Sequence, residues 1–148
     1  NLNVQFVQTS AYFMIMNEMI HNVRVVRMNK EHRDGPSMNW EGDSVGYWEG
    51  DTLVVDTVNF WKGTAFADST SKMHLVEKFT RTGPDSIQYQ FTIEDPTTWI
   101  APWTAVIPMR SMHQPIYEYA CHEGNYGFHG VMAGIRRLQL ETEQGVVR

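Results

Sequence analysis

Short runs of alternating apolar and polar residues, separated by Gly, Pro, Asn and Asp, dominate this chain of 148 residues. The clearest run is Ser86–Glu94, in which Ile87 to Ile93 supply an apolar residue at every second position. A two-residue period puts the apolar side chains on one face of a strand and the polar ones on the other. Further strands are predicted at Val4–Gln8, Ala11–Met19, Val23–Met28, Val45–Glu49, Thr52–Phe60, Met73–Arg81, Trp103–Arg110 and Ile116–His122.

Turn residues join several of these strands directly. Gly50-Asp51 predicts a hairpin between Val45–Glu49 and Thr52–Phe60, and Gly83-Pro84-Asp85 predicts another before Ser86–Glu94. Two polar segments without a usable period, Asn29–Glu41 and Trp61–Lys72, are predicted to be long loops. The length of the first favours a lid.

The end of the chain has a different period. Apolar residues recur at helical spacing over Val131–Thr142, which predicts one C-terminal helix. The fold class is therefore mainly β: an antiparallel meander closing into a lipocalin-like barrel or a strongly curved sheet, with the helix packed outside. A two-sheet sandwich is the alternative.

Composition limits the function more than it identifies it. The length fits a single β domain over residues 1–148, and the start at Asn1 suggests a processed or incomplete N-terminus. A net charge of −5 argues against nucleic acid and anionic membranes as partners. The sequence contains no apolar run long enough to predict a membrane span.

Three carboxylates interrupt apolar rows of the predicted strands: Glu18, Asp56 and Glu77. An unpaired buried carboxylate is costly, so each is expected to find a cation or a donor, to change its pKa, or to lie at the wet mouth of a cavity. Arg24 and Arg81 share rows with apolar residues, and either one is a candidate counter-charge. These groups are either structural ion pairs and exposed strand ends, or parts of one ligand pocket.

The histidines lack the spacing of metal ligands, and the sequence predicts neither a metal site nor a cofactor. His74 and Glu77 form an H-x-x-E string, but on a strand their side chains point to opposite faces. Cys121, the single cysteine, lies beside His122. Adjacent strand residues cannot bond as nucleophile and base, which favours an inert cysteine.

Cys121–Gly130 is the segment most typical of a site, because its glycines allow turns that bring neighbouring polar side chains together. The alternative is a helix start at which Asn125 or His129 satisfies free backbone groups. Three tryptophans beside the long loops and the Asp95-Pro96 corner are expected to line the mouth of an apolar cavity.

The leading hypothesis is a binding or catalytic cavity for a small, partly apolar molecule; if the domain is an enzyme, the predicted reaction is that of a lyase or isomerase. The predicted catalytic residues are His122, Glu77 and Glu123. The predicted ligand-binding residues are Glu18, Arg24, Asp56, Arg81, Trp40, Trp61, Trp99, Asn125 and Tyr126. The alternative is a structural or accessory subunit that binds another protein through the Met-rich strand around Tyr12–Met19.

Five ordered motifs carry a family resemblance: GDSVGYWEGDTLVVDT, MHLVEKFTR, IEDPTTWIAPWTA, EYACHEGNYGF and GIRRLQLE. In this order they resemble a large family of uncharacterised bacterial proteins that are commonly exported and often have a longer N-terminal region. The resemblance implies a periplasmic or secreted location. This chain has Ser69 where a His is often found in that family, which argues against a metal site in that loop.

Overall fold

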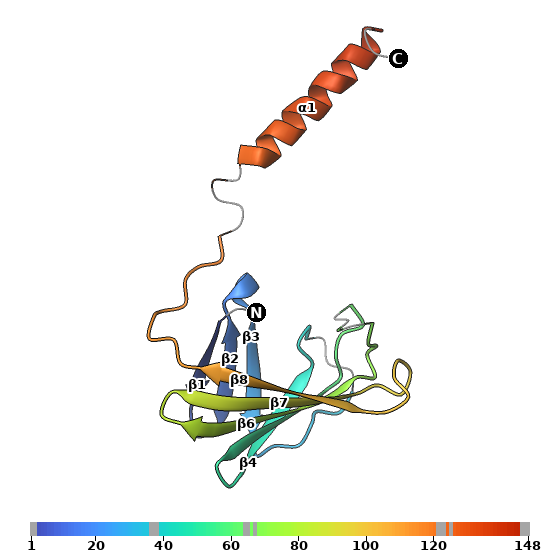
Figure 1. Ribbon diagram of the computed structural model, residues 1–148. Coiled ribbons are helices and arrows are strands. Elements are labelled where there is room, and N and C mark those ends of the chain that lie inside the picture. Colours follow the sequence, from blue (N-terminus) through green and yellow to red (C-terminus); the bar gives the residue numbers. More distant parts are fainter. Residues whose placement is uncertain are drawn as a thin grey trace. The chain divides into compact units, whose positions relative to one another are not determined.

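The computed structural model describes residues 3–35, 39–63, 66, 68–120, 124 and 126–145. The chain divides into two compact units, residues 1–117 and residues 118–148. The first unit contains every strand, and the second contains the long helix (Figure 1).

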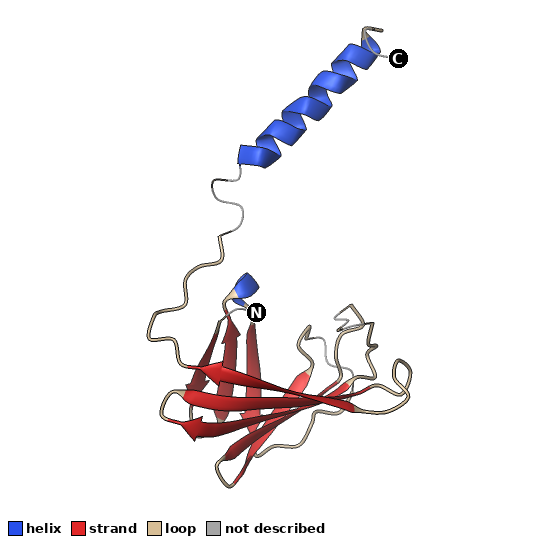
Figure 2. Cartoon of the chain, viewed as in Figure 1, coloured by secondary structure: helices blue, strands red, loops and turns tan. Residues whose placement is uncertain are grey.

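The first unit is one eight-stranded sheet whose strands follow one another in sequence order. The sheet curls into a half-barrel with β1 and β8 at its two edges (Figure 2), which confirms the predicted mainly β, strongly curved sheet. Its strands are β1 Val4–Gln8, β2 Tyr12–Asn17, β3 Val23–Met28, β4 Asp43–Glu49, β5 Thr52–Val58, β6 His74–Gly83, β7 Ser86–Glu94 and β8 Trp103–Arg110. A short 3-10 turn, η1 Met19–His21, joins β2 to β3.

One strand pair departs from the predicted meander. β3 and β4 are parallel, with Val26 opposite Ser44 and Met28 opposite Gly46. A parallel neighbour requires a connection of about a dozen residues or more, and the polar segment 29–42 provides it. The sequence predicts this loop but contains no local signal for the direction in which the next strand leaves it.

Two further differences concern the end of the chain. The predicted strand Ile116–His122 is wrong for residues 116–120, which form no strand, while 121 and 122 lie outside the described residues. An alternating segment forms a strand only where a neighbouring strand supplies hydrogen bonds, and residues 116–120 pair with no strand of the described sheet. The helix is confirmed and is longer than predicted: α1 spans Tyr126–Glu143.

The inner face of the half-barrel holds the core. Phe6 of β1 lies 5.4 Å from Phe79 of β6 between ring centroids, so the sheet curls until its first and sixth strands touch through side chains. A first apolar cluster contains Phe13, Ile15, Val26, Met28, Leu53, Val55 and Phe79. A second contains Phe60, Met73 and Ile93, with Leu75, Phe91, Trp99 and Trp103 packed against it.

Within the part of the chain that the structure describes, no helix combines the length and the apolar character needed to cross a membrane.

Candidate functional site

Two groups of ionisable side chains lie on opposite faces of β5 and β6. Val55 is opposite Glu77 and Asp56 is opposite Val76, and directly opposed residues share a face. Glu77 therefore points to the inner face with buried Val55, whereas Asp56 and His74 point to the outer face. The predicted divergence of His74 and Glu77 is confirmed.

On the inner face, Arg24 of β3 pairs with Glu77. The Arg24 Nη2 atom lies 2.8 Å from Glu77 Oε1, to which it donates a hydrogen bond, and 2.7 Å from Oε2. The Tyr89 hydroxyl donates to Oε1 at 2.8 Å. Arg24 is thus the predicted counter-charge. Arg81 is not: it is exposed and donates to the carbonyl oxygens of Gly83 and Pro84 in its own hairpin.

Burial and charge act in opposite directions on this inner group. Burial lowers the pKa of Arg24, but the adjacent Glu77 carboxylate outweighs it and raises that pKa above its ordinary value. Burial and Glu77 together raise the pKa of Tyr89 far above its usual range, so the phenol stays a donor. Arg24 and Tyr89 thereby neutralise and bond Glu77, the predicted catalytic residue, inside the core.

On the outer face, four side chains form a group that we call the His–Asp cluster: His32, Asp43, Asp56 and His74. His32 lies between the two carboxylates, with Nδ1 3.0 Å from Asp43 Oδ2 and Nε2 3.1 Å from Asp56 Oδ1. His74 Nε2 lies 2.9 Å from the same Asp56 Oδ1 atom. The loop 29–42 and strands β4, β5 and β6 each contribute one member.

Asp43 is the buried centre of this cluster. Besides His32, it accepts hydrogen bonds from Arg27 Nη2, at 2.9 and 3.0 Å from its two oxygens, and from the Arg33 backbone N–H at 3.0 Å. Burial raises the pKa of Asp43, but the bonds from Arg33, His32 and Arg27 outweigh it and hold that pKa below its ordinary value. Asp43 is therefore an anion that only accepts.

The partners of His32 limit the hydrogen bonds that its ring can make. A carboxylate faces each ring nitrogen, and a carboxylate accepts hydrogen bonds without donating any. In the imidazolium form His32 would donate to both Asp43 and Asp56, whereas the neutral ring would donate to only one of them. By the same reasoning His74 donates through Nε2 to Asp56. The cluster thus contains proton donors and a shared acceptor within hydrogen-bond distance of one another, which is what general acid–base chemistry requires.

Local sequence explains how these side chains are placed. Gly42, directly before Asp43, has a φ of 74°, and a Cβ atom there would lie 2.6 Å from the Val58 carbonyl oxygen. Only glycine fits this close approach, which starts β4 beside the end of β5. The Gly50-Asp51 turn then sets the hairpin register that places Asp56 opposite Val45.

Within the sheet unit, the other predicted site residues that the structure describes have partners outside the cluster. Glu18 accepts a hydrogen bond from Asn3 Nδ2 at 2.6 Å. Trp40 packs on Trp61 with ring centroids 4.1 Å apart, whereas Trp99 packs against Trp103 in the second apolar cluster. Tyr126 is exposed at the start of α1. His122, Glu123 and Asn125, like Cys121, lie outside the described residues.

Asp56 was predicted to bind a ligand, but its partners His32, Asp43 and His74 were not assigned to a site. A usable signal existed for Asp43, a carboxylate that follows a glycine at the start of a strand. The position of His32 depends on how residues 29–35 fold back over the sheet. No pattern within that loop predicts this.

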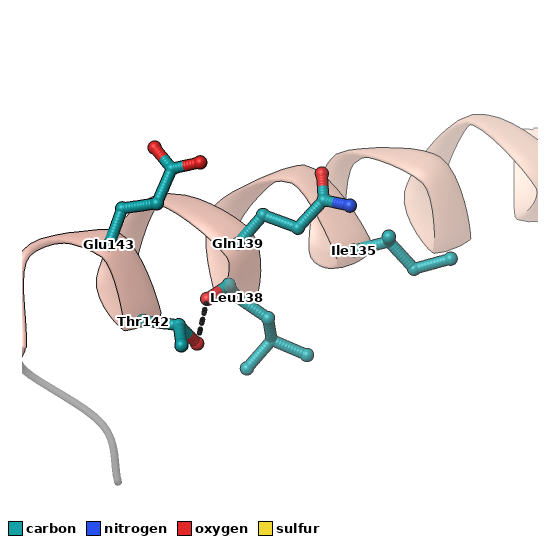
Figure 3. A pocket seen from close by; sticks show the side chains of 5 residues that line it. All are labelled: Ile135, Leu138, Gln139, Thr142 and Glu143. Atoms are coloured by element: carbon teal, nitrogen blue, oxygen red, sulfur yellow. Dashed lines mark hydrogen bonds between the residues drawn. The ribbon is translucent and has the colours of Figure 1, made fainter.

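Two depressions lie on the surface of the described residues. One lies along a single face of α1 and is lined by Ile135, Leu138, Gln139, Thr142 and Glu143, with the Thr142 hydroxyl donating to the Leu138 carbonyl oxygen at 2.8 Å (Figure 3). The other lies at the hairpin tips, where Arg81 and Trp48 are among the lining residues. Both are open to solvent. Among the described side chains, no three His, Cys, Asp or Glu residues are arranged to hold a metal ion.

Comparisons of this chain with protein-family models, with curated proteins and with solved structures found no significant match.

Proposed function

We propose that this chain is a small-molecule-binding domain whose site is the His–Asp cluster, and that His32 and Asp56 transfer protons there, as in a lyase or an isomerase. One observation carries the proposal. The Nε2 atoms of His32 and His74, which come from two separate segments, both lie within hydrogen-bond distance of the Asp56 Oδ1 atom. The side chains of His32, Asp56 and His74 keep 28, 29 and 38% of their surface exposed. The groups are therefore both organised and within reach of a ligand.

The arrangement favours proton transfer next to a carbonyl group. Asp43 fixes the His32 ring through Nδ1, and a ligand oxygen that takes the place of Asp56 Oδ1 would accept the Nε2–H bond. In the proposed step, Asp56 takes a proton from the carbon beside the carbonyl group, and His32 donates its Nε2 proton to the carbonyl oxygen. The product is an enol. Asp56 ends protonated and His32 ends neutral, so protons and charge balance.

The test measures deuterium exchange from D₂O into a panel of small ketones, 2-oxo acids and 3-hydroxy acids. The exchange is detected as the loss of C–H signals in proton NMR. We expect the wild type to exchange at least one compound, and Asp56→Asn and His32→Gln to lower its rate by about 10²-fold or more. His113→Gln is the matched control, because His113 is exposed after β8 and its Nε2 atom lies 3.8 Å from Oδ1 of Asp85, a residue of the β6–β7 turn. Exchange no faster than in buffer, or full activity of Asp56→Asn, would refute the proposal.

The helix α1 favours a second candidate function, an accessory subunit of a protein assembly. Phe128, Val131, Ile135 and Leu138 recur at helical spacing and are all exposed. The first strands fit this role less well than predicted, because alternate residues of β2 are buried in the core. Sedimentation velocity separates the two candidates, since an obligate assembly would not sediment as a 17.1 kDa monomer. A periplasmic or secreted location stays a prediction from the resemblance alone.

A further inference from the structure

The segment Asn29–Gly35, which we call the strap, lies against the outer face of the sheet and is held there by hydrogen bonds. Its first residue donates a backbone hydrogen bond to the Gly46 carbonyl oxygen at 2.7 Å. Arg27 Nη2 donates to the Glu31 carbonyl oxygen at 3.0 Å, and Asn59 Nδ2 donates to the Gly35 carbonyl oxygen at 3.2 Å. Between these points the strap is fastened by His32 and by the Arg33 N–H, which both bond Asp43.

His32 is the contact of the strap that depends on a proton. As an imidazolium it donates to β4 through Asp43 and to β5 through Asp56. Neutral imidazole has one N–H donor and one lone pair. After loss of a proton, one of the two short contacts would therefore set a lone pair against a carboxylate oxygen, and a bond to a charged group would become a repulsion.

Several charged groups face this contact. Asp43 and Asp56 bond the ring directly, and Arg27 offsets part of the charge of Asp43. His74 shares the Asp56 oxygen, and its Nδ1 lies 4.0 Å from Glu94 Oε2. The strap itself carries Lys30, Glu31, Arg33 and Asp34. Both direct contacts of the ring are therefore to carboxylates, and only the protonated ring can donate to both of them.

We propose that His32 is a pH-operated latch: in its protonated form it holds the strap on the outer face of β4 and β5, and loss of the proton releases the strap. The closed state is then favoured at low pH and weakened as the pH rises through the range in which histidine titrates. The latch stands on the contacts of His32 alone. That closure of the strap brings His32 to Asp56 and completes the ligand site rests on the proposed function.

The test measures the protection of the Arg33 amide against exchange with water by NMR, expressed as a protection factor so that the intrinsic pH dependence of exchange is removed. In the wild type we expect at least about tenfold more protection at pH 5.5 than at pH 8.5, the factor that corresponds to one bond to a charged group. His32→Gln keeps one donor and cannot be charged, so its protection should be low and independent of pH. His113→Gln should behave like the wild type.

Equal protection of Arg33 at both pH values in the wild type, or a wild-type pH response that persists in His32→Gln, would overturn the latch. Amide spectra of the remaining sheet report whether each variant is folded. The outcome is independent of the deuterium-exchange panel: a pH response of the strap without exchange into any compound keeps the latch and removes the proposed function. Exchange without a pH response of the strap does the reverse.

Discussion

Replacing Arg24 by Met should destabilise the sheet unit by about 3 to 5 kcal/mol, because it leaves the Glu77 carboxylate buried without its cation. The side chains of Arg24 and Glu77 keep only 10 and 4% of their surface exposed, and the guanidinium lies 2.7 and 2.8 Å from the two carboxylate oxygens. Solvent therefore screens little of the interaction. The variant removes the attraction and retains the cost of burying the charge.

The size of the effect can be checked against an exposed pair on the same strand. Lys78 Nζ lies 3.1 Å from Glu49 Oε2, but these side chains are 40 and 50% exposed. Breaking such a pair costs about 0 to 1 kcal/mol. Lys78→Met is thus the matched control, since it removes a cation at similar distance in a different environment.

Removing both charges should recover most of the lost stability. Buried ion pairs exchanged for apolar side chains of similar volume are often neutral or better, so Arg24→Met with Glu77→Leu should lie well above Arg24→Met alone. The Tyr89 hydroxyl then loses its acceptor, which costs about 1 to 3 kcal/mol. Adding Tyr89→Phe removes that unpaired group and should raise stability again.

The assay is urea unfolding at pH 7 followed by circular dichroism of the sheet, with the free energy extrapolated to water. A loss of about 3 to 5 kcal/mol corresponds to a fall in Tm of roughly 10 to 20 °C for a unit of this size. If Arg24→Met lost no more stability than Lys78→Met, or if the double variant lost as much as the sum of both single variants, a buried coupled pair would be refuted.

Two further predictions concern the connections of the sheet. Gly42→Ala should lose about 3 kcal/mol or more of unfolding free energy in the same assay, because its Cβ would lie 2.6 Å from the Val58 carbonyl oxygen. Gly50 has a φ of 59° and no atom within 4 Å of a Cβ placed there, so Gly50→Ala should lose only about 1 kcal/mol. Equal losses in the two variants would contradict the close approach at Gly42. Burial raises the pKa of Asp95, but hydrogen bonds from Thr97 and Thr70 outweigh burial and hold that pKa far below the unfolded value of about 3.9. The stability that Asp95 contributes is therefore present above about pH 4 and is lost as the pH falls below that value. Comparing unfolding at pH 7 and pH 3, Asp95→Asn should show a smaller acid loss than the wild type, and an equal loss would show that Asp95 is not the responsible group.

Local sequence patterns were sufficient to predict much of the secondary structure of this protein. Alternation over two residues identified β7, and the Gly50-Asp51 and Gly83-Pro84-Asp85 turns identified the β4–β5 and β6–β7 hairpins. These features depend on neighbours in sequence, so a local pattern is sufficient. The same alternation marked Glu77 and Arg24 as polar residues in apolar rows. Their pairing followed because burial leaves such charges few alternatives.

Tertiary structure decided what the loops do. The parallel pairing of β3 with β4 and the missing strand at 116–120 depend on which segments find a neighbour in the sheet. The His–Asp cluster depends on the strap folding back over the outer face, so that His32 meets Asp56 from a distant strand. Side chains brought together by a loop share no period or spacing, because loop conformation is set by contacts with the whole sheet rather than by adjacent residues.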